Sequence, residues 1–542
     1  MGHRASRRPM GVGPVAAGAA GVRRRRHRRW TVGAAAAAIA LVGAGCIPEP
    51  PVEEPPAEPP VTSLSVSTAP AEMFPEFSPD VSDYVVRCAN VPFDVRVEAP
   101  DAQPISVGGN PAQTGRFTVS VWRAEGQRFT IVDQGAARTY SVRCLPGDFP
   151  EFTVTREGTP QAGHYLIAPI QFTAAGFQPT YAVVFDAHGV PVWWSRQSSI
   201  FLQQLPNGNL AWTRWNGEAA EEIGLDGSVI TTIEAPHPYP GTAFDFHDMI
   251  RLANGNYMIV LNEELPNQDL SIIDPSLADV PVFDHRLVEI DPATGDILWS
   301  WLASDHIDVA ETDPQWYGYV RNRPDMSLGT PLYDIFHWNS VEETPTGYLL
   351  SFRHLDAVYA IERATGDVEW KLGGVDVPGD SLVISGDSRF PGPGFGGQHD
   401  ARYLPGASAT QFEVTLYDNG SDLAAPRTPR ALRYIVHTLG FLTDRFGATG
   451  IDTVAGTATL VEEIFDLTHA PVSPFAGSAR RLAGGNWMIG FGGTNGFSET
   501  TPSGEVVFHL SIDGGQLVYR ALPAVPGLDP AALRAGMDAQ HP

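Results

Sequence analysis

The feature that most constrains this chain is a tight glycine turn that recurs between short apolar segments after residue 150. The turns are Pro206-Asn207-Gly208, Ala253-Asn254-Gly255, Pro345-Thr346-Gly347 and Ala483-Gly484-Gly485. Asn-Gly between apolar runs is the strongest short-range hairpin signal, because both central residues of such a turn need positive φ. The repeated turn therefore predicts a series of β-hairpins.

A second kind of hairpin alternates with the first. It has an acidic residue, then a glycine, then a tryptophan, as in Asp186-Gly189-Trp193, Asp291-Gly295-Trp299 and Glu362-Gly366-Trp370. Two alternating hairpins make a four-stranded sheet, and a chain of such sheets is the signature of a β-propeller. About 390 residues follow residue 150, and repeats of about 45 to 65 residues would give six to eight blades.

Composition supports an all-β fold. Hydrophobic residues make up 43% of the 542 residues and charged residues 18%, which is enough apolar material for packed cores. The 55 glycines and 47 prolines favour many turns over long helices. We therefore predict an all-β chain in which residues 148–542 form the propeller.

Residues 61–147 have a different pattern. Short alternating segments such as 93–97 and 117–121 are separated by turn residues at strand-length intervals, which predicts a small β-sandwich. The run LSVSTAPAEMFPEFSPDVSDYVV and the closing TYSVRC resemble the cadherin-like β-sandwich modules of bacterial surface proteins. We expect this module to act as a spacer or support.

The first 46 residues read as an export signal. A basic region ends at Arg29, an apolar run extends from Val32 to Val42, and small residues precede Cys46; the run is too short to span a bilayer. The position of Cys46 resembles a bacterial lipoprotein processing site, which implies lipidation of this residue. The alternative is an ordinary signal peptide with a coincidental cysteine. Residues 47–60 alternate proline with glutamate and predict a stiff spacer.

These segments predict an exported protein, periplasmic or on the cell surface, that contacts the membrane only through a lipid anchor at Cys46. Cys88 and Cys144 remain, and two cysteines in an exported chain favour a disulfide over a pair of buried thiols. The net charge is -26, and removal of the nine arginines before Cys46 leaves 36 - 9 = 27 basic and 62 acidic residues, a net charge of -35. Such a surface repels phosphate backbones, so nucleic acid is not an expected partner.

Three histidines occupy one position of the repeat. They precede the first hairpin's leading strand: His247 in FDFHDMIRLANGN, His337 in DIFHWNSVEETPTG and His399 in GGQHDARYLPG. The first strand of each blade lines the central channel of a propeller, so we expect the three imidazoles to converge at one mouth of it. The other histidines, including His354, His469 and His509, are interpreted as structural.

Strand geometry adds two polar residues. Asn339 lies two residues after His337 and should share its face, and the return strand after Gly347 should bring Arg353 beside His337. A pocket with three imidazoles, an amide and a guanidinium suits a tetrahedral oxyanion such as sulfate, because arginine offers a fixed fork of donors and imidazole can donate, accept or attack.

The motifs in their order resemble the bacterial arylsulfate sulfotransferases. The resemblance extends from about residue 150 to 515 and rests on His247-Asp248 with its NGN turn, DIFHWNSV with SFRH, GGQHDARYLP, and Tyr417-Asp418-Asn419-Gly420. It implies a six-bladed propeller that transfers a sulfuryl group from a phenolic sulfate ester to a phenol. The implied kinetics are ping-pong through a sulfohistidine, with no nucleotide donor or other cofactor.

Carried over by the same resemblance, His399 is the nucleophile, and His247, His337, Asn339 and Arg353 form the sulfuryl site. Thr494 is a further substrate-binding candidate. The expected partners are a small-molecule aryl sulfate donor and a phenolic acceptor, with a homodimer left open.

Two alternatives compete with a sulfotransferase. Three convergent histidines are also a metal site for zinc, copper or iron. Arg353 argues against a metal, because a cation beside a dication is unfavourable unless an anion lies between them. A non-catalytic, ligand-binding propeller on a stalk is the second alternative, since the sandwich and the acidic surface permit it.

Overall fold

The computed structural model describes residues 60–173, 176–196, 199–214, 219–234, 243–325, 331–387, 394–421, 426–438, 455–525 and 527–542. The expected export signal, the lipidation site Cys46 and nearly all of the Pro/Glu spacer lie outside the described residues. Within the described ranges, we find no helix whose length and hydropathy would let it span a bilayer.

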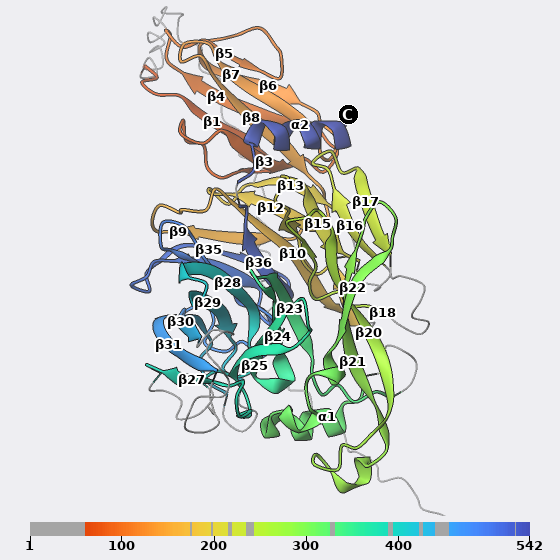
Figure 1. Cartoon of the computed structure of the whole chain (residues 1–542). Helices are drawn as coiled ribbons and strands as arrows, with labels where there is room; N and C mark the ends of the chain where they lie inside the picture. Colours follow the sequence, from red (N-terminus) through yellow and green to blue (C-terminus); the bar gives the residue numbers. More distant parts are fainter. Residues whose placement is uncertain are drawn as a thin grey trace, which may run out of the picture. The chain divides into compact units, whose positions relative to one another are not determined.

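The all-β prediction is confirmed. The described residues form eight sheets, and their helices are short. The helices are α1 (Tyr317–Asn322), α2 (Pro530–Gln540) and the 3-10 helices η1 (Pro275–Leu277), η2 (Ala303–Asp305), η3 (Val309–Glu311), η4 (Pro314–Trp316) and η5 (Arg353–Leu355). Figure 1 shows the strands in sequence colours, with α2 at the C-terminus.

The N-terminal region contains two sheets. One has the order β1 (Ser65–Ala69), β4 (Phe93–Ala99), β6 (Gly115–Val121). The other has the order β2 (Met73–Phe74), β3 (Asp83–Arg87), β8 (Arg138–Leu145), β7 (Arg128–Asp133), β5 (Ile105–Val107). Alternation explains the strands: in β4 the side chains of Phe93, Val95, Val97 and Ala99 are buried in one hydrophobic cluster, while those between them are not.

A disulfide joins Cys88 and Cys144, as predicted. Cys88 follows β3 directly and Cys144 lies in β8, and these two strands pair in parallel. The pairing brings the two cysteines side by side within the buried cluster of this region.

Six further sheets follow among the described residues. The first has the order β36 (Gln516–Pro523), β10 (His164–Thr173), β12 (Ala182–Asp186), β13 (Pro191–Ser195), with β11 (Gly176–Pro179) also on β10. The second is β14 (Gln203–Gln204), β15 (Leu210–Thr213), β16 (Ala219–Ile223), β17 (Val229–Glu234). The third is β18 (Ala243–Phe244), β20 (Tyr257–Gln268), β21 (Val280–Ile290), β22 (Ile297–Leu302), with β19 (Ile250–Arg251) also on β20.

The last three sheets repeat the arrangement. The fourth is β23 (Trp338–Glu343), β24 (Gly347–Phe352), β25 (Ala357–Glu362), β26 (Val368–Gly373). The fifth is β28 (His399–Ser408), β29 (Gln411–Asp418), β30 (Arg430–Thr438), β31 (Gly456–Ile464), β27 (Leu382–Ser385). The sixth is β32 (Ser478–Arg481), β33 (Trp487–Gly490), β34 (Gly496–Thr500), β35 (Val506–Ile512), β9 (Phe152–Arg156).

Strands from the two ends of this region complete its first and last sheets. The early strand β9 pairs with β35 of the sixth sheet, and the late strand β36 pairs with β10 of the first sheet. The residues on β36 are therefore placed by pairing with a strand about 350 residues earlier in the chain.

Glycine explains the repeated hairpin turns in two ways. Gly208, Gly255 and Gly485 have positive φ, which a residue without Cβ adopts at little cost. Gly347 does not, but a Cβ on it would lie 2.0 Å from the carbonyl oxygen of Ile361 on β25. That turn needs glycine for close backbone approach.

Helix α2 contacts both the two-sheet N-terminal region and the six-sheet region of the compact unit 60–542. Asp529 caps its first turn, and Leu533 and Met537 are buried in a cluster with residues of the first sheet. On its other side Asp538 accepts a hydrogen bond from Arg143, while Arg534 pairs with Asp83 of β3.

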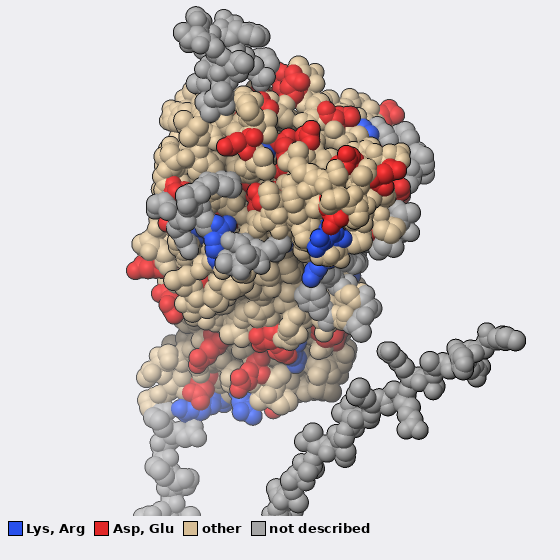
Figure 2. All heavy atoms as spheres, turned by 90° about the horizontal axis from the view of Figure 1, so that it is seen from below, with Lys and Arg blue, Asp and Glu red and all other residues tan. Residues whose placement is uncertain are grey.

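Charge on the surface is mainly acidic. On the face drawn in Figure 2, aspartate and glutamate side chains are widely spread, whereas lysine and arginine form a few small groups. This distribution accords with the net charge of -26.

Candidate functional site

The structure brings the predicted histidines close together. The ring centroids of His247 and His337 are 5.4 Å apart. The ring of Tyr519, on β36, lies 5.7 Å from that of His247 and 6.4 Å from that of His399. His247 precedes β19, His337 precedes β23 and His399 begins β28, so the third, fourth and fifth sheets each supply one imidazole.

A carboxylate fixes the ring of His247 and that of His337. Nδ1 of His247 lies 2.8 Å from Oδ1 of Asp245, and Nδ1 of His337 lies 2.5 Å from Oδ2 of Asp334. Because a carboxylate only accepts, each Nδ1 carries a proton. Burial alone would raise the pKa of Asp334, but interactions with the neighbouring imidazoles, above all with His337, outweigh it and lower that pKa. Both Nε2 atoms are thereby left for proton exchange with a substrate.

His399 is held differently. Its side chain is buried, Nδ1 lies 2.9 Å from the carbonyl oxygen of Gly397 and 2.7 Å from Oδ1 of Asn419, and the backbone N–H of Ala476 donates to Nε2 at 3.1 Å. Nδ1 is therefore protonated and Nε2 carries the lone pair. Burial first, and the charge of Arg353 second, hold the pKa of His399 well below its ordinary value. The imidazole is neutral, as a nitrogen nucleophile must be.

Asn419 positions both His399 and the loop that contains Ser473 and Ala476. Its Nδ2 donates to the carbonyl oxygens of Ser473 and Ala476, at 3.0 and 2.8 Å. The same side chain therefore fixes the tautomer of His399 and the peptide that caps its Nε2.

Arg353 lies beside His337, as the sequence predicts. Its backbone N–H donates to the carbonyl oxygen of His337 at 2.8 Å, and its guanidinium lies 4.2 Å from the ring centroid of Trp316. One terminal nitrogen donates to Nε2 of His354 at 2.9 Å, and the other to the carbonyl oxygen of Pro474 at 3.3 Å. Its buried Nε has no hydrogen-bond partner among the described residues.

Asn339 is placed differently from what the sequence suggested, and Thr494 lies in a turn. His337 has φ 51° and precedes the strand, so Asn339 does not follow it by strand alternation. Asn339 instead donates from Nδ2 to the carbonyl oxygen of Gln398, next to His399. Thr494 lies in the turn between β33 and β34, where its carbonyl oxygen accepts from Val518. Oδ1 of Asn339 and Oγ1 of Thr494 are buried without a partner in the described part of the chain.

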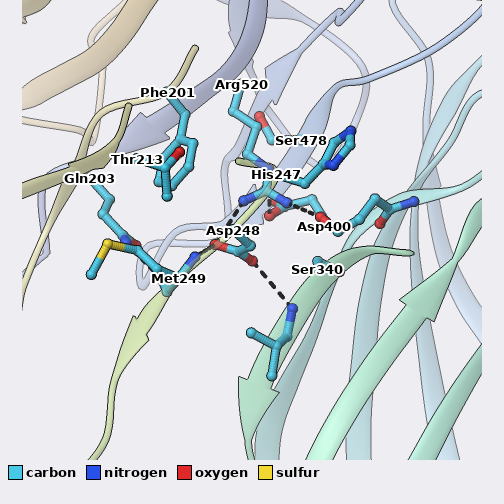
Figure 3. A network of polar contacts seen from close by, with 12 residues as sticks. Phe201, Gln203, Thr213, His247, Asp248, Met249, Ser340, Asp400, Ser478 and Arg520 are labelled. Carbon is cyan, nitrogen blue, oxygen red and sulfur yellow. Dashed lines mark hydrogen bonds and ion pairs between the residues drawn. The ribbon is translucent and has the colours of Figure 1, made fainter. Parts of the chain in front are cut away.

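A buried ionic layer supports two of the histidines, and sequence reasoning did not find it. Asp248 and Asp400 directly follow His247 and His399, and both carboxylates face Arg520 of β36, at 3.0 and 3.8 Å (Figure 3). Arg402 also contacts both carboxylates, at 2.9 and 2.8 Å. Burial would raise the pKa of Asp400, but the arginine charges outweigh it and lower that pKa. Charges this deeply buried persist only when they are paired.

His354 also belongs to the site, although the sequence reading treated it as structural. Nδ1 donates to the carbonyl oxygen of Asp334 at 2.7 Å, and Nε2 accepts from Arg353. Burial lowers the pKa of His354 well below its ordinary value, so the ring stays neutral and can accept from the guanidinium. His354 therefore orients Arg353.

Two groups of side chains have metal-ligating atoms close together in the described residues: Asp334, His337 and His354, and Asp466, His469 and His509. In the first group the lone pair of His354 accepts from Arg353. In the second the two imidazoles stack with centroids 3.7 Å apart and planes 16° apart. Lone pairs of parallel rings run side by side and do not converge, so a cation there requires the rings to turn.

Comparison with known proteins gives one family. The model of the family described as arylsulfotransferase (ASST) matches residues 202–513. No curated protein matches the chain.

Three solved structures show distant similarity to the chain. A protein of unknown function from Bacteroides caccae is 12% identical with a TM-score of 0.36, and the match covers 67% of this chain and 99% of that one. A streptogramin B lyase is 10% identical with a TM-score of 0.30, covering 78% and 98%. The virginiamycin B lyase from Staphylococcus aureus is 10% identical with a TM-score of 0.29, covering 78% and 99%. TM-scores of this size assign neither fold nor function to the chain.

Proposed function

The chain belongs to the arylsulfotransferase family, and on this premise we propose that it is an arylsulfate sulfotransferase. It would move a sulfuryl group from a phenolic sulfate ester to a phenol, without a nucleotide donor or cofactor. The observation that carries the proposal is the state of His399: a buried, neutral imidazole with Nδ1 protonated, placed with Arg353 and two carboxylate-held histidines.

In the first half-reaction the lone pair of His399 Nε2 forms a bond to sulfur. The bond between sulfur and the aryl oxygen breaks, and its electron pair leaves on the phenolate oxygen. That oxygen takes a proton from His247 or His337, whose Nδ1 atoms are anchored on Asp245 and Asp334. The bond to sulfur replaces the hydrogen bond that Ala476 donates to Nε2.

In the second half-reaction a phenol takes the place of the departed product. Its oxygen attacks sulfur, the bond between sulfur and Nε2 breaks, and the electron pair returns to His399. The phenol proton passes to the histidine that acted as acid before. Throughout, Arg353 and Asn339 would bind the sulfuryl oxygens, where fixed donors stabilise shifting charge most. Thr494 would supply its hydroxyl to the same group.

For the fold, we propose that the six sheets after residue 150 are the blades of one propeller. Its ends would be joined by β9 in the sixth sheet and β36 in the first. We further propose export, with a lipid anchor at Cys46 and the two-sheet region 61–147 as a support module. A homodimer is a further hypothesis.

The test of function is transfer from a chromogenic aryl sulfate, measured with and without a phenol acceptor. We expect phenol release that accelerates with acceptor concentration, with parallel double-reciprocal plots. His399→Ala should abolish both half-reactions, while His188→Ala, a histidine outside the site, should match the wild type. Folded wild-type protein that releases no phenol from any aryl sulfate, or a His399→Ala variant with near-native transfer, would overturn the proposal.

A further inference from the structure

Tyr519 lies in the site, and neither the motifs nor the proposed mechanism uses it. It is on β36, the strand that pairs with β10 of the first sheet, and its side chain is 8% exposed. Its ring is close to both His247 and His399, at 5.7 and 6.4 Å between centroids. Among the described residues, Tyr519 is the only tyrosine whose ring lies close to the rings of two of the predicted catalytic histidines.

The hydroxyl of Tyr519 is buried and has no hydrogen-bond partner among the described residues. A buried tyrosine hydroxyl normally finds a partner, because leaving it without one costs its full desolvation energy. Two further buried donors without a partner, Nε of Arg353 and Oγ1 of Thr494, belong to candidates for the sulfuryl site, whereas the unpartnered atom of Asn339 is the acceptor Oδ1. The three unpartnered donors of Tyr519, Arg353 and Thr494 point to one anionic ligand among them.

The environment keeps this hydroxyl protonated. Burial raises the pKa of Tyr519 above its ordinary value, and of the nearby charges that of Arg520 opposes this rise while that of Asp245 adds to it. A phenol with a raised pKa is a weaker acid than the phenol products, so it cannot supply them with a proton. It can still donate a hydrogen bond to an anionic oxygen.

We propose that the Tyr519 hydroxyl donates a hydrogen bond to an oxygen of the sulfuryl group as this group passes between the aryl oxygen and His399. This inference rests on the proposed function and adds a substrate-contacting residue to it. No proton is transferred and no bond is made or broken at Tyr519. The hydroxyl serves both half-reactions equally, because the sulfuryl oxygens are common to both.

The variant Tyr519→Phe tests this, since it keeps the ring and removes only the hydroxyl. The matched control is Tyr434→Phe on β30, because Tyr434 is also buried with an unpartnered hydroxyl and is not in the site. We expect Tyr519→Phe to lower the rate of each half-reaction by about 10²-fold, as for loss of one oxyanion donor. Tyr434→Phe should stay within about twofold of the wild type.

A series of aryl sulfates whose phenols have different pKa values shows whether the Tyr519 hydroxyl donates to a sulfuryl oxygen or to the leaving oxygen. A donor to a sulfuryl oxygen lowers the rate by the same factor for every ester, so the slope of rate against phenol pKa is unchanged. A slope that steepens in Tyr519→Phe would place the hydroxyl on the leaving oxygen and overturn the inference. Wild-type rates in Tyr519→Phe, or equal losses in both variants, would also overturn it.

A binding measurement keeps the inference testable apart from the proposed function. Inorganic sulfate is titrated calorimetrically into the wild type and both variants. We expect Tyr519→Phe to bind sulfate about tenfold more weakly, equivalent to about 1.4 kcal/mol, and Tyr434→Phe to bind it as the wild type does. If the wild type transfers no sulfuryl group, the proposed function fails while a selective loss of sulfate binding still supports Tyr519 as an oxyanion ligand. Equal sulfate binding by all three proteins, or none by the wild type, contradicts it.

Discussion

Replacing Asn419 with aspartate should favour the cationic form of His399 and raise its pKa. Oδ1 of Asn419 accepts from Nδ1 of His399 at 2.7 Å, and a carboxylate there would favour the protonated ring. Protonation removes the lone pair of Nε2, which is the electron pair that must attack sulfur. Asn419→Asp is therefore expected to lose activity at pH values where the wild type is still active, without any change in the residues that contact the substrate.

The size of the effect follows from the geometry. At hydrogen-bond distance the centres of the two charges are about 4 Å apart, and at an effective dielectric constant of about 20 they attract by about 4 kcal/mol. That is about 3 pKa units in favour of the imidazolium. The new carboxylate also faces the carbonyl oxygens of Ser473 and Ala476 in place of an N–H donor. Each lost hydrogen bond costs about 1 to 3 kcal/mol of stability.

The assay is kcat/KM for an aryl sulfate across a range of pH, with unfolding measured in parallel. The acid limb of the profile should move to higher pH by about 3 units in Asn419→Asp, so activity should recover as pH rises. Asn419→Ala is the matched control, because it loses the same hydrogen bonds without adding charge. Its activity should fall and its acid limb should move to lower pH, opposite to the shift in Asn419→Asp, because the hydrogen bond with Asn419 raises the pKa of His399 in the wild type. An unshifted profile in a folded Asn419→Asp protein would refute the assigned tautomer of His399.

Three further outcomes are expected. Burial lowers the pKa of His509 to about 4, so the unfolded chain binds a proton at this imidazole more tightly than the folded chain does, and the protein loses stability as the pH falls below the pKa of the unfolded state. In urea titrations at pH 7 and pH 5, the unfolding free energy of the wild type should fall by about 2 kcal/mol more than that of His509→Gln. Equal losses in the two proteins would contradict this expectation. Met537→Ala should lower the unfolding free energy by about 2 to 5 kcal/mol because Met537 is fully buried; a loss well under 1 kcal/mol would mean that α2 is not part of the core. Arg520→Met removes a shared partner of Asp248 and Asp400 and should cost about 3 to 5 kcal/mol, and an unfolding midpoint equal to that of the wild type would show that Arg402 suffices.

The hairpins of the repeat could be predicted because their signal is local. An Asn-Gly turn and its flanking apolar residues lie within one hairpin, so the sequence alone indicates where β15 or β20 begins. The pairings of β9 with β35 and of β36 with β10 join segments some 350 residues apart. No local pattern specifies such partners, and for that reason Tyr519 and Arg520 on β36 were not predicted in the site.

The site residues also divide into those that a local sequence pattern indicates and those that only the fold brings together. The repeat position singled out His247, His337 and His399, and the return strand singled out Arg353. Asn419 belongs to one of the motifs of the resemblance, but the sequence predicts no role for it, because its contacts with His399 and Ala476 are made by the fold and not by neighbours in sequence.

In each Asp–His pair the aspartate lies only two or three residues before its histidine, so the sequence shows that the two could pair. The contact made by His337 also depends on the left-handed backbone conformation of this residue. Helix α2 has a local signal in the sequence. Asp529 and Pro530 form an N-cap followed by a proline at the first helical position.

The central claim is that His399 carries the sulfuryl group between the two half-reactions. The most direct measurement is rapid acid or alkali quench of the protein mixed with an aryl sulfate in the absence of acceptor, followed by peptide mapping by mass spectrometry. We predict one added sulfuryl group, located on the peptide that contains His399 and lost when a phenol is added before the quench. A sulfuryl group on another residue, or phenol release with no modified peptide, would contradict the account.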